Sequence, residues 1–129
     1  MTVLFACVHN SGRSQMAAAF IDKLSRGRVK TISAGTEPAK VIDPTVVKVM
    51  GEVGIDISHQ KPKGLTPEMI EQADKIITMG CRMEEICPAT LVETEDWDID
   101  NPKEKPMEKV RQIRKQVQAK VRGLLEEIP

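Results

Sequence analysis

The chain opens with a strand, a short polar loop and a helix, and this order restricts the folds that it can adopt. Val3–Val8 is a continuous apolar run of the length expected for a buried strand. Asn10-Ser11-Gly12 interrupts the run, and Ser14–Leu24 then carries apolar residues at helical spacing. A strand without polar alternation belongs inside a sheet that helices cover on both faces, so the opening predicts an α/β fold.

The rest of the chain continues the alternation of strands and helices. Further strands are expected at Val29–Ala34, at Lys75–Met79 and from a start at Leu91–Val92. Further helices are expected from Pro44 to a stop at Gly54, from Pro67 to Ala73 and from Met107 to Ile128. Asp43 and Thr66 each precede a proline, which places a capping side chain before the residue favoured at the first helical position. Gly80–Asp96 is the least regular stretch, and Asp96–Pro106 reads as an acidic loop.

Strands that alternate with helices predict a parallel sheet with helices on both faces, connected by right-handed crossovers. One domain over residues 1-129 is expected, because the chain has 129 residues and shows no linker or internal repeat. Ligands of such sheets bind outside the carboxyl ends of the strands. Cys7 lies at the carboxyl end of the first strand, so we expect the functional site there.

Composition excludes several classes of partner. Lysine and arginine together number 19, as do aspartate and glutamate, which gives no electrostatic case for binding nucleic acid or an anionic membrane surface. The first apolar run is too short for a signal peptide or a membrane span, so a cytoplasmic location is expected. Three cysteines in a chain of this kind argue for reactive thiols or a metal site rather than for a disulfide framework.

The segment from Cys7 to Ser14 has the spacing of an oxyanion site. Five residues separate Cys7 from Arg13, which lets a loop wrap until its backbone N–H groups converge on one point. The helix that follows adds its unsatisfied N-terminal donors and the positive end of its dipole. Such a nest binds a tetrahedral dianion. The residues expected to form this oxyanion-binding loop are Val8, His9, Asn10, Ser11, Gly12 and Arg13.

Each polar side chain of the segment has an expected role. The positive field favours the thiolate form of Cys7, the candidate nucleophile, and Arg13 can grip two oxygens of the anion. Ser14 can donate a hydrogen bond to the thiolate and stabilise it as a leaving group. Asn10 can make the loop rigid or adopt a left-handed conformation. His9 either orients the loop or is simply solvated. The competing interpretation of the segment is a buried cysteine followed by an ordinary turn.

The loop and several later stretches resemble the low-molecular-weight protein tyrosine phosphatase superfamily, and most of all its thioredoxin-coupled arsenate reductase branch. The matching stretches are Cys7-Val8-His9-Asn10-Ser11-Gly12-Arg13-Ser14-Gln15-Met16-Ala17, Ser33-Ala34-Gly35-Thr36, Gly54-Ile55-Asp56-Ile57-Ser58, Ile76-Ile77-Thr78-Met79-Gly80-Cys81 with Cys87-Pro88, and Trp97-Asp98-Ile99. The two later cysteines and the continuation after Arg13 point to the reductase branch. The resemblance implies one α/β domain with a four-stranded parallel sheet, and no cofactor or bound metal is expected.

The resemblance also implies a relay of three thiols. Cys7 would attack arsenate and form a thiol–arsenate adduct. Cys81 would attack Cys7, which releases arsenite and leaves a Cys7–Cys81 disulfide. Cys87 would then attack Cys81 and move the disulfide outward, where thioredoxin or a similar dithiol protein could reduce it. The expected partners are therefore an arsenate or phosphate-like oxyanion and a dithiol reductant, and the protein is expected to act as a monomer.

Three other interpretations stay open at this point. Cys81 and Cys87 could bind zinc together with a histidine, although their spacing is longer than usual and the chain has two histidines. Cys81 could be an inert packed residue, which would leave a phosphatase that hydrolyses phosphate monoesters through a Cys7 phosphoenzyme. The chain could also be a non-catalytic module that binds oxyanions or senses redox state.

The sequence departs from the pattern of the resembled family at its general acid. In that family an aspartate directly precedes a late proline, whereas here Asn101 precedes Pro102. We hypothesise that Asp100 replaces the missing acid, and the competing interpretation is a solvated acidic loop. The chain has no tyrosine, and Lys103-Glu104 follow the proline, which favours a small inorganic substrate over an aromatic ester. Gly12 stands where reductases often carry a second loop cysteine.

Overall fold

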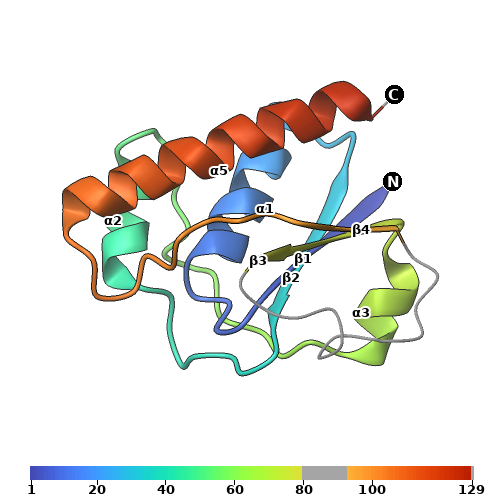
Figure 1. Cartoon of the computed structure of the whole chain (residues 1–129), viewed down its shortest axis with the longest axis horizontal. Helices are drawn as coiled ribbons and strands as arrows, with labels where there is room; N and C mark the ends of the chain where they lie inside the picture. Colours follow the sequence, from blue (N-terminus) through green and yellow to red (C-terminus); the bar gives the residue numbers. More distant parts are fainter. Residues whose placement is uncertain (80–92, 129) are drawn as a thin grey trace.

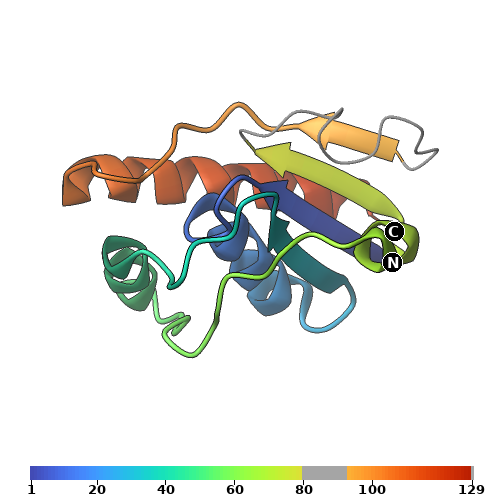
Figure 2. The ribbon, with the colours of Figure 1, turned by 90° about the horizontal axis from the view of Figure 1, so that it is seen from below.

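Four parallel strands form one sheet in the order β2-β1-β3-β4, as the computed structural model shows for residues 1–79 and 93–128 (Figures 1 and 2). The elements in chain order are β1 (Thr2–Cys7), α1 (Arg13–Ser25), β2 (Lys30–Gly35), α2 (Pro44–Gly51), α3 (Pro67–Gln72), β3 (Lys75–Met79), β4 (Glu93–Asp96) and α5 (Met107–Glu127). The α/β class and the four-stranded parallel sheet are confirmed.

Helices cover both faces of the sheet, but unequally. Figure 1 shows α1 and α5 across one face and α3 on the opposite side. Val3, Phe5 and Cys7 belong to a large core that includes residues of α1, α2 and α5. Leu4 belongs to a smaller core with Ile70 of α3. Because apolar side chains are buried on both faces of β1, this strand is a continuous apolar run.

The carboxyl end of β1 is the point at which the chain changes direction across the sheet. β1 pairs with β2 on one side and with β3 on the other, so Cys7 lies between Gly35 and Met79 in the register. The chain passes from β1 through α1 to β2 and only later returns to β3. Open α/β sheets bind their ligands at such a switch point. The fold therefore places Cys7 where the sequence predicted a site.

Two helices begin as their capping residues predict. The Asp43 side chain accepts a hydrogen bond of 2.9 Å from the backbone N–H of Thr45, and Thr66 accepts one of 3.2 Å from Met69. In both cases a proline occupies the start of the helix. These local bonds fix where α2 and α3 enter, since they satisfy donors that the helices leave unpaired.

The end of α2 differs from the prediction. The helix ends at Gly51 and not at Gly54. The N–H of Val53 bonds to the carbonyl of Met50, and that of Gly54 bonds to the carbonyl of Gly51. These bonds reach back three residues instead of four, so the chain tightens into turns before it leaves at Gly54, whose φ is +80°.

The start predicted for the fourth strand, Leu91–Val92, lies outside the described residues. The described strand β4 covers Glu93–Asp96, which directly follows that start. Among the described strands, β4 pairs with β3 alone and lies at the edge of the sheet. An edge strand needs no apolar run, so the pattern of apolar residues in the sequence does not reveal where such a strand lies.

The loop after β4 is fixed to the sheet at its start. The N–H of Trp97 donates to the carbonyl of Thr78 at 2.9 Å. The Trp97 ring is buried against Phe5, with ring centroids 5.6 Å apart. Ile99 is also buried, so residues 97–106 are anchored rather than fully solvated. This anchoring holds the loop beside the carboxyl end of β1.

α5 joins the large core to α2. Arg114 donates to the carbonyl of Val49 at 2.6 Å and to the carboxylate of Glu52 at 2.8 Å. Hydrogen bonds from Arg111 and then from Arg114 lower the pKa of Glu52 to about 2. These contacts hold α2, whose N-terminus touches the Cys7 loop. Within the described residues, no helix is long and apolar enough to cross a membrane.

Candidate active site

The backbone of the loop between β1 and α1 is turned so that its carbonyl groups point away from Cys7. Three of them accept hydrogen bonds from backbone N–H groups of the segment after β2: Val8 from Glu37 at 2.8 Å, His9 from Ala39 at 2.9 Å and Ser11 from Asp43 at 2.9 Å. In a trans peptide the N–H points opposite to the carbonyl. The N–H groups that follow these carbonyls therefore point into the loop, toward the side of Cys7.

The inward N–H groups form the expected nest. The N–H of Asn10 donates to Cys7 Sγ at 3.1 Å. Among the described residues, none accepts a hydrogen bond from the N–H of His9, Ser11 or Gly12. Donors that converge without a protein acceptor are what a tetrahedral oxyanion requires. The arrangement agrees with the loop predicted from the sequence.

Cys7 Sγ has two hydrogen-bond partners. Ser14 Oγ lies 2.9 Å from the sulfur. The Cys7 residue is buried, with 3 % of its surface exposed. Asn10 Nδ2 donates to the same Ser14 oxygen at 2.7 Å. The bond from Asn10 leaves the Ser14 proton available, so Ser14 can donate to Cys7 when the sulfur carries a negative charge. The sulfur thus has Ser14 Oγ and the backbone N–H of Asn10 as hydrogen-bond partners.

Asn10 is the central residue of this network. Its φ is +52°, so it adopts the left-handed conformation that the sequence analysis considered. Its side-chain oxygen accepts from the backbone N–H of Lys63 at 2.8 Å. That contact decides the orientation of the amide, because the opposite orientation would set Nδ2 against a donor. Asn10 therefore both makes the loop rigid and adopts the left-handed conformation.

Arg13 and Gly12 connect the loop to residues 97–106. Arg13 Nη1 donates to the carbonyl of Ile99 at 2.9 Å, and the residue is 8 % exposed. A Cβ added at Gly12 would lie 2.7 Å from Cγ of Pro102. A side chain at position 12 would therefore displace the proline ring. This contact explains why glycine occupies the position at which a second loop cysteine was considered.

Asp100 lies near this loop but is bound elsewhere. Its carboxylate is 3.0 Å from Lys109 Nζ, and the side chain is 61 % exposed. The hydrogen bond from Lys109 lowers the pKa of Asp100, which favours the ionised form. Asn101 accepts from the backbone N–H of Lys103 at 3.0 Å and so stabilises a local turn. In this arrangement neither residue donates a proton to the Cys7 loop, and the general-acid role stays a prediction.

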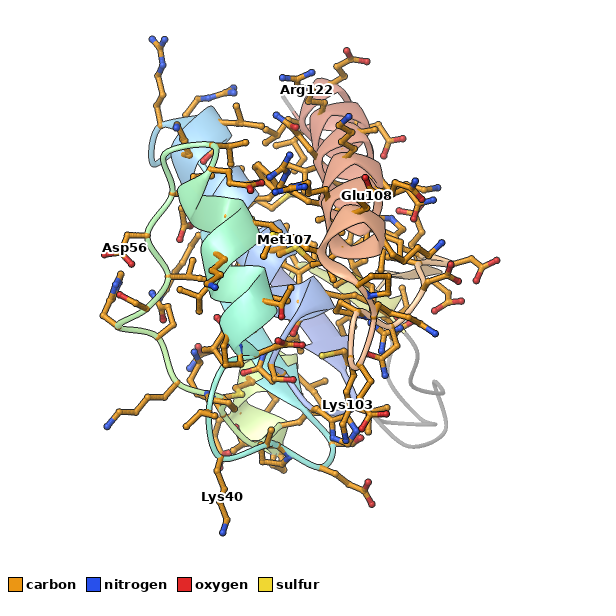
Figure 3. The ribbon with its side chains drawn as sticks, turned by 90° about the vertical axis from the view of Figure 1, so that its left-hand side faces the viewer. Lys40, Asp56, Lys103, Met107, Glu108 and Arg122 are labelled. Carbon is orange, nitrogen blue, oxygen red and sulfur yellow. The ribbon has the colours of Figure 1, made fainter. Side chains whose placement is uncertain are left out.

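His9 of the loop is bound to the segment after β2, and two exposed lysines are sequence neighbours of residues that touch the loop. His9 Nδ1 lies 3.1 Å from the carbonyl of Glu37, and since a carbonyl only accepts, the ring nitrogen donates. This bond ties His9 to the segment after β2 and favours an orienting role over simple solvation. Lys40 and Lys103 are exposed, and their neighbours Ala39 and Pro102 touch the loop (Figure 3).

Two predicted residues, Cys81 and Cys87, lie outside the described residues. The relay and the zinc interpretation therefore stay predictions. Elsewhere, in residues 1–79 and 93–128, no group of three or more histidine, cysteine, aspartate or glutamate residues could hold a metal ion. Cys7 itself is a free thiol.

Gly35, which the sequence analysis named only within the matching stretch Ser33-Ala34-Gly35-Thr36, lies in close contact with the Cys7 loop. It ends β2, and a Cβ built on it would lie 2.6 Å from the carbonyl oxygen of Val8 and 3.0 Å from the nitrogen of Asn10. The oxyanion loop thus packs directly on the Gly35 backbone. A glycine at the end of a strand is the available signal, because it often marks a close approach of another backbone segment.

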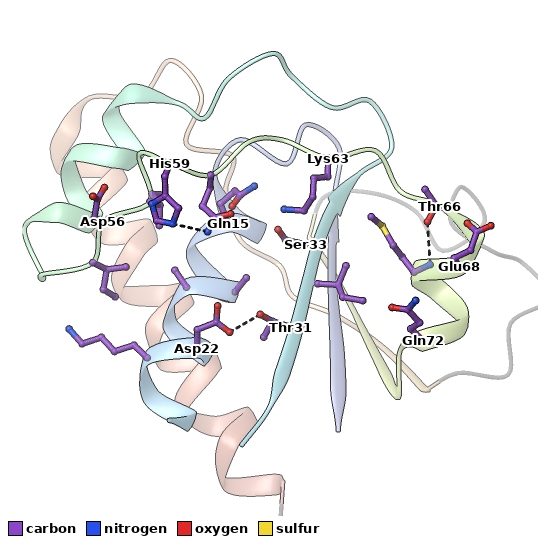
Figure 4. A pocket seen from close by; sticks show the side chains of 18 of the residues that line it. Gln15, Asp22, Thr31, Ser33, Asp56, His59, Lys63, Thr66, Glu68 and Gln72 are labelled. Atoms are coloured by element: carbon purple, nitrogen blue, oxygen red, sulfur yellow. Dashed lines mark hydrogen bonds between the residues drawn. The ribbon is translucent and has the colours of Figure 1, made fainter. Parts of the chain in front are cut away.

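A polar groove of about 930 Å³ lies behind the loop. It runs between α1, β2 and the segment before α3, and Figure 4 shows Gln15, Ser33 and Lys63 close together, between His59 on one side and Thr66 on the other. Cys7 is not among the residues that line it. The groove is therefore separate from the nest, although Gln15 and Lys63 take part in both through Asn10.

Comparisons with known proteins agree with this geometry. The sequence model of the family "Low molecular weight phosphotyrosine protein phosphatase" matches residues 2–129. A putative arsenate reductase of Halobacterium salinarum is 38% identical over 128 residues, which are 95% of this chain and 89% of that protein.

Two solved structures extend the comparison. The structure described as an arsenate reductase in the phosphate binding state has a TM-score of 0.89 and 33% identity, over 99% of this chain and 98% of that one. The thioredoxin-dependent arsenate reductase of Corynebacterium glutamicum has a TM-score of 0.85 and 36% identity over 98% of this chain. This chain spans 61% of that longer one.

Gly35→Ala is expected to weaken phosphate binding by about 10- to 100-fold, because the new methyl group displaces the Val8 carbonyl and with it the nest. Isothermal titration calorimetry with inorganic phosphate measures the effect. The matched control is Gly123→Ala in α5, where no atom lies within 4 Å of the added Cβ and binding should be unchanged. Equal phosphate affinity in wild type and Gly35→Ala would show that the close contact does not shape the nest.

Proposed function

The chain belongs to the low molecular weight phosphotyrosine protein phosphatase family, and on this premise we propose that it reduces arsenate to arsenite with Cys7 as the nucleophile. One observation carries the proposal: Cys7 Sγ accepts a hydrogen bond from the N–H of Asn10 and lies 2.9 Å from Ser14 Oγ, at the base of a nest of inward N–H groups. Relatives that match almost all of this chain and bear the name arsenate reductase support arsenate as the substrate.

The first step uses the nest and the thiolate together. Arsenate binds with its oxygens on the converging N–H groups and on the guanidinium of Arg13. The Cys7 thiolate attacks arsenic, a sulfur–arsenic bond forms, and one arsenate oxygen leaves as water after it takes up protons. The nest stabilises the negative charge of the oxygens through this step because its donors are fixed before the anion arrives.

The second step reduces arsenic. The Cys81 thiolate attacks Cys7 Sγ, a disulfide forms, and the electron pair of the sulfur–arsenic bond passes to arsenic. Arsenic goes from the +5 to the +3 state and leaves as arsenite. Cys87 then attacks Cys81, and the Cys7 thiolate departs. Ser14 and the N–H of Asn10 lower the cost of this departure, since they stabilise a leaving thiolate.

A dithiol protein such as thioredoxin completes the cycle. The Cys81–Cys87 disulfide holds the two oxidising equivalents that the reaction produced, and reduction by an external dithiol returns both thiols. One of the similar solved structures is described as thioredoxin-dependent, which supports this class of reductant.

Asp100 is our candidate for the group that protonates the leaving oxygen. To act in this way it has to separate from Lys109, with which it forms an ion pair of 3.0 Å in the structure. It directly follows Ile99, whose carbonyl accepts from Arg13, so a small rearrangement of residues 97–106 brings the carboxyl group toward the anion. The neutral form of the carboxyl group would be the donor.

The relay predicts different stopping points for three variants. With arsenate, thioredoxin, thioredoxin reductase and NADPH, Cys7→Ser, Cys81→Ser and Cys87→Ser are each expected to lose steady-state NADPH consumption. Cys87→Ser should still release one arsenite per chain and accumulate the Cys7–Cys81 disulfide, which peptide mass mapping under non-reducing conditions detects. Full turnover by Cys81→Ser would contradict the relay. Cleavage of p-nitrophenyl phosphate without arsenate reduction in wild type would favour a phosphatase instead.

Asp100→Ala is expected to lower arsenate turnover by about 100-fold, the usual contribution of a general acid. Asp98→Ala is the matched control, because Asp98 is an exposed aspartate in the same loop. Since Lys109 lowers the pKa of Asp100, Lys109→Met should raise that pKa and move the decline in turnover to higher pH. Turnover of Asp100→Ala that equals wild type at every pH would end the assignment.

A further inference from the structure

Gln15 is a buried amide in the first turn of α1 whose partners all lie on segments next to the nest. The residue is 3 % exposed, so its amide needs hydrogen-bond partners inside the protein. Gln15 Nε2 lies 3.0 Å from Asn10 Oδ1 and 3.2 Å from the backbone oxygen of Asn10. It also lies 3.4 Å from the carbonyl oxygen of Lys61. Nothing in the reaction described above uses this side chain.

The two contacts with Asn10 fix both the backbone and the side chain of that residue. Asn10 has a φ of +52°, which an L-residue adopts only when its surroundings hold it there. The bond to its carbonyl orients the peptide on one side of Asn10. The bond to Oδ1 acts together with the bond from the Lys63 N–H, and the two turn Nδ2 toward Ser14, which it meets at 2.7 Å. Gln15 thus acts on the one residue that contacts both Cys7 and Ser14.

The chemistry of the contact requires a donor of this length. Both Asn10 atoms that face Gln15 are oxygens, and the amide NH2 of glutamine has two hydrogens that can be donated to two acceptors. Glutamate has the same length but would set an acceptor against two acceptors. Methionine fills a similar volume and donates nothing. Lys63 also holds Asn10, since its backbone N–H donates to Asn10 Oδ1. Figure 4 shows that Lys63 lies near Gln15 in the groove.

We propose that Gln15 is a positioning residue for the Cys7 thiolate. It donates to both oxygens of Asn10, and Asn10 in turn donates its backbone N–H to Cys7 and its amide to Ser14. The inference rests on the proposed function, in which Cys7 is the nucleophile. When the Gln15 donor is lost, Asn10 is free to leave its left-handed conformation and the sulfur loses hydrogen bonds that favour its charged form.

The test measures how fast iodoacetamide alkylates Cys7 at a series of pH values, with the site identified by peptide mass mapping. Gln15→Met is expected to move the pH midpoint of alkylation upward by about one unit, the size expected when a charged group loses a hydrogen bond. Gln15→Glu should move it at least as far. His9 and Arg13, the other titratable or charged side chains of the loop, are the same in every variant.

Two reference variants decide what a shift means. Asn10→Ala should reproduce the shift, because it removes the residue through which Gln15 acts. Gln116→Met makes the same chemical change on an exposed position of α5 and should leave the midpoint unchanged. A midpoint that stays at the wild-type value in Gln15→Met and Gln15→Glu, while Asn10→Ala shifts it, would overturn the proposal.

The assay separates this inference from the proposed function, because alkylation does not depend on arsenate turnover. A shifted midpoint in a protein whose wild type fails to reduce arsenate would support the positioning role and contradict the reductase. If wild type reduces arsenate normally and the Gln15 variants leave the alkylation midpoint unshifted, the reductase would be supported and the positioning role contradicted. Thermal unfolding of each variant identifies any that do not fold, and for these the other Gln15 variant supplies the measurement.

Discussion

The outward direction of three loop carbonyls is the constraint on which the site depends. Val8, His9 and Ser11 each give their carbonyl oxygen to a backbone N–H of the segment between β2 and α2. The N–H groups at the other ends of these peptide groups therefore point into the space beside Cys7. Gly35 makes the arrangement geometrically feasible, because a side chain there would occupy the position of the Val8 carbonyl.

The rest of the fold holds the two sides of this contact in place. β1 delivers Cys7 to the carboxyl edge of the sheet, and its pairing with β2 brings Gly35 into register beside it. α5 holds α2 through the contact between Arg114 and Glu52. Just before α2, the N–H of Asp43 donates a hydrogen bond to the carbonyl of Ser11. The buried Trp97 fixes the start of the loop whose Ile99 carbonyl binds Arg13. The contacts that join these elements to one another therefore also position the Cys7 loop.

Local patterns in the sequence predicted most of this structure, and long-range contacts account for what they missed. The apolar run of β1 and the aspartate–proline start of α2 are readable because their causes lie within a few residues. The same holds for the nest, whose spacing is local. The roles of Gly35 and Gln15 depend on backbone groups that only the fold brings near. The described residues of β4, Glu93–Asp96, are all polar, so the sequence indicated a strand there only through the apolar Leu91–Val92 before them.

The central proposal is that Cys7 is a nucleophile at the base of a nest that binds a tetrahedral oxyanion. The most direct measurement is the rate of Cys7 alkylation by iodoacetamide at neutral pH as inorganic phosphate is added. The account predicts that saturating phosphate protects Cys7 completely from alkylation. The phosphate concentration that halves the alkylation rate should equal the Kd measured independently by calorimetry. A rate of Cys7 alkylation that is unchanged when phosphate is bound would contradict it.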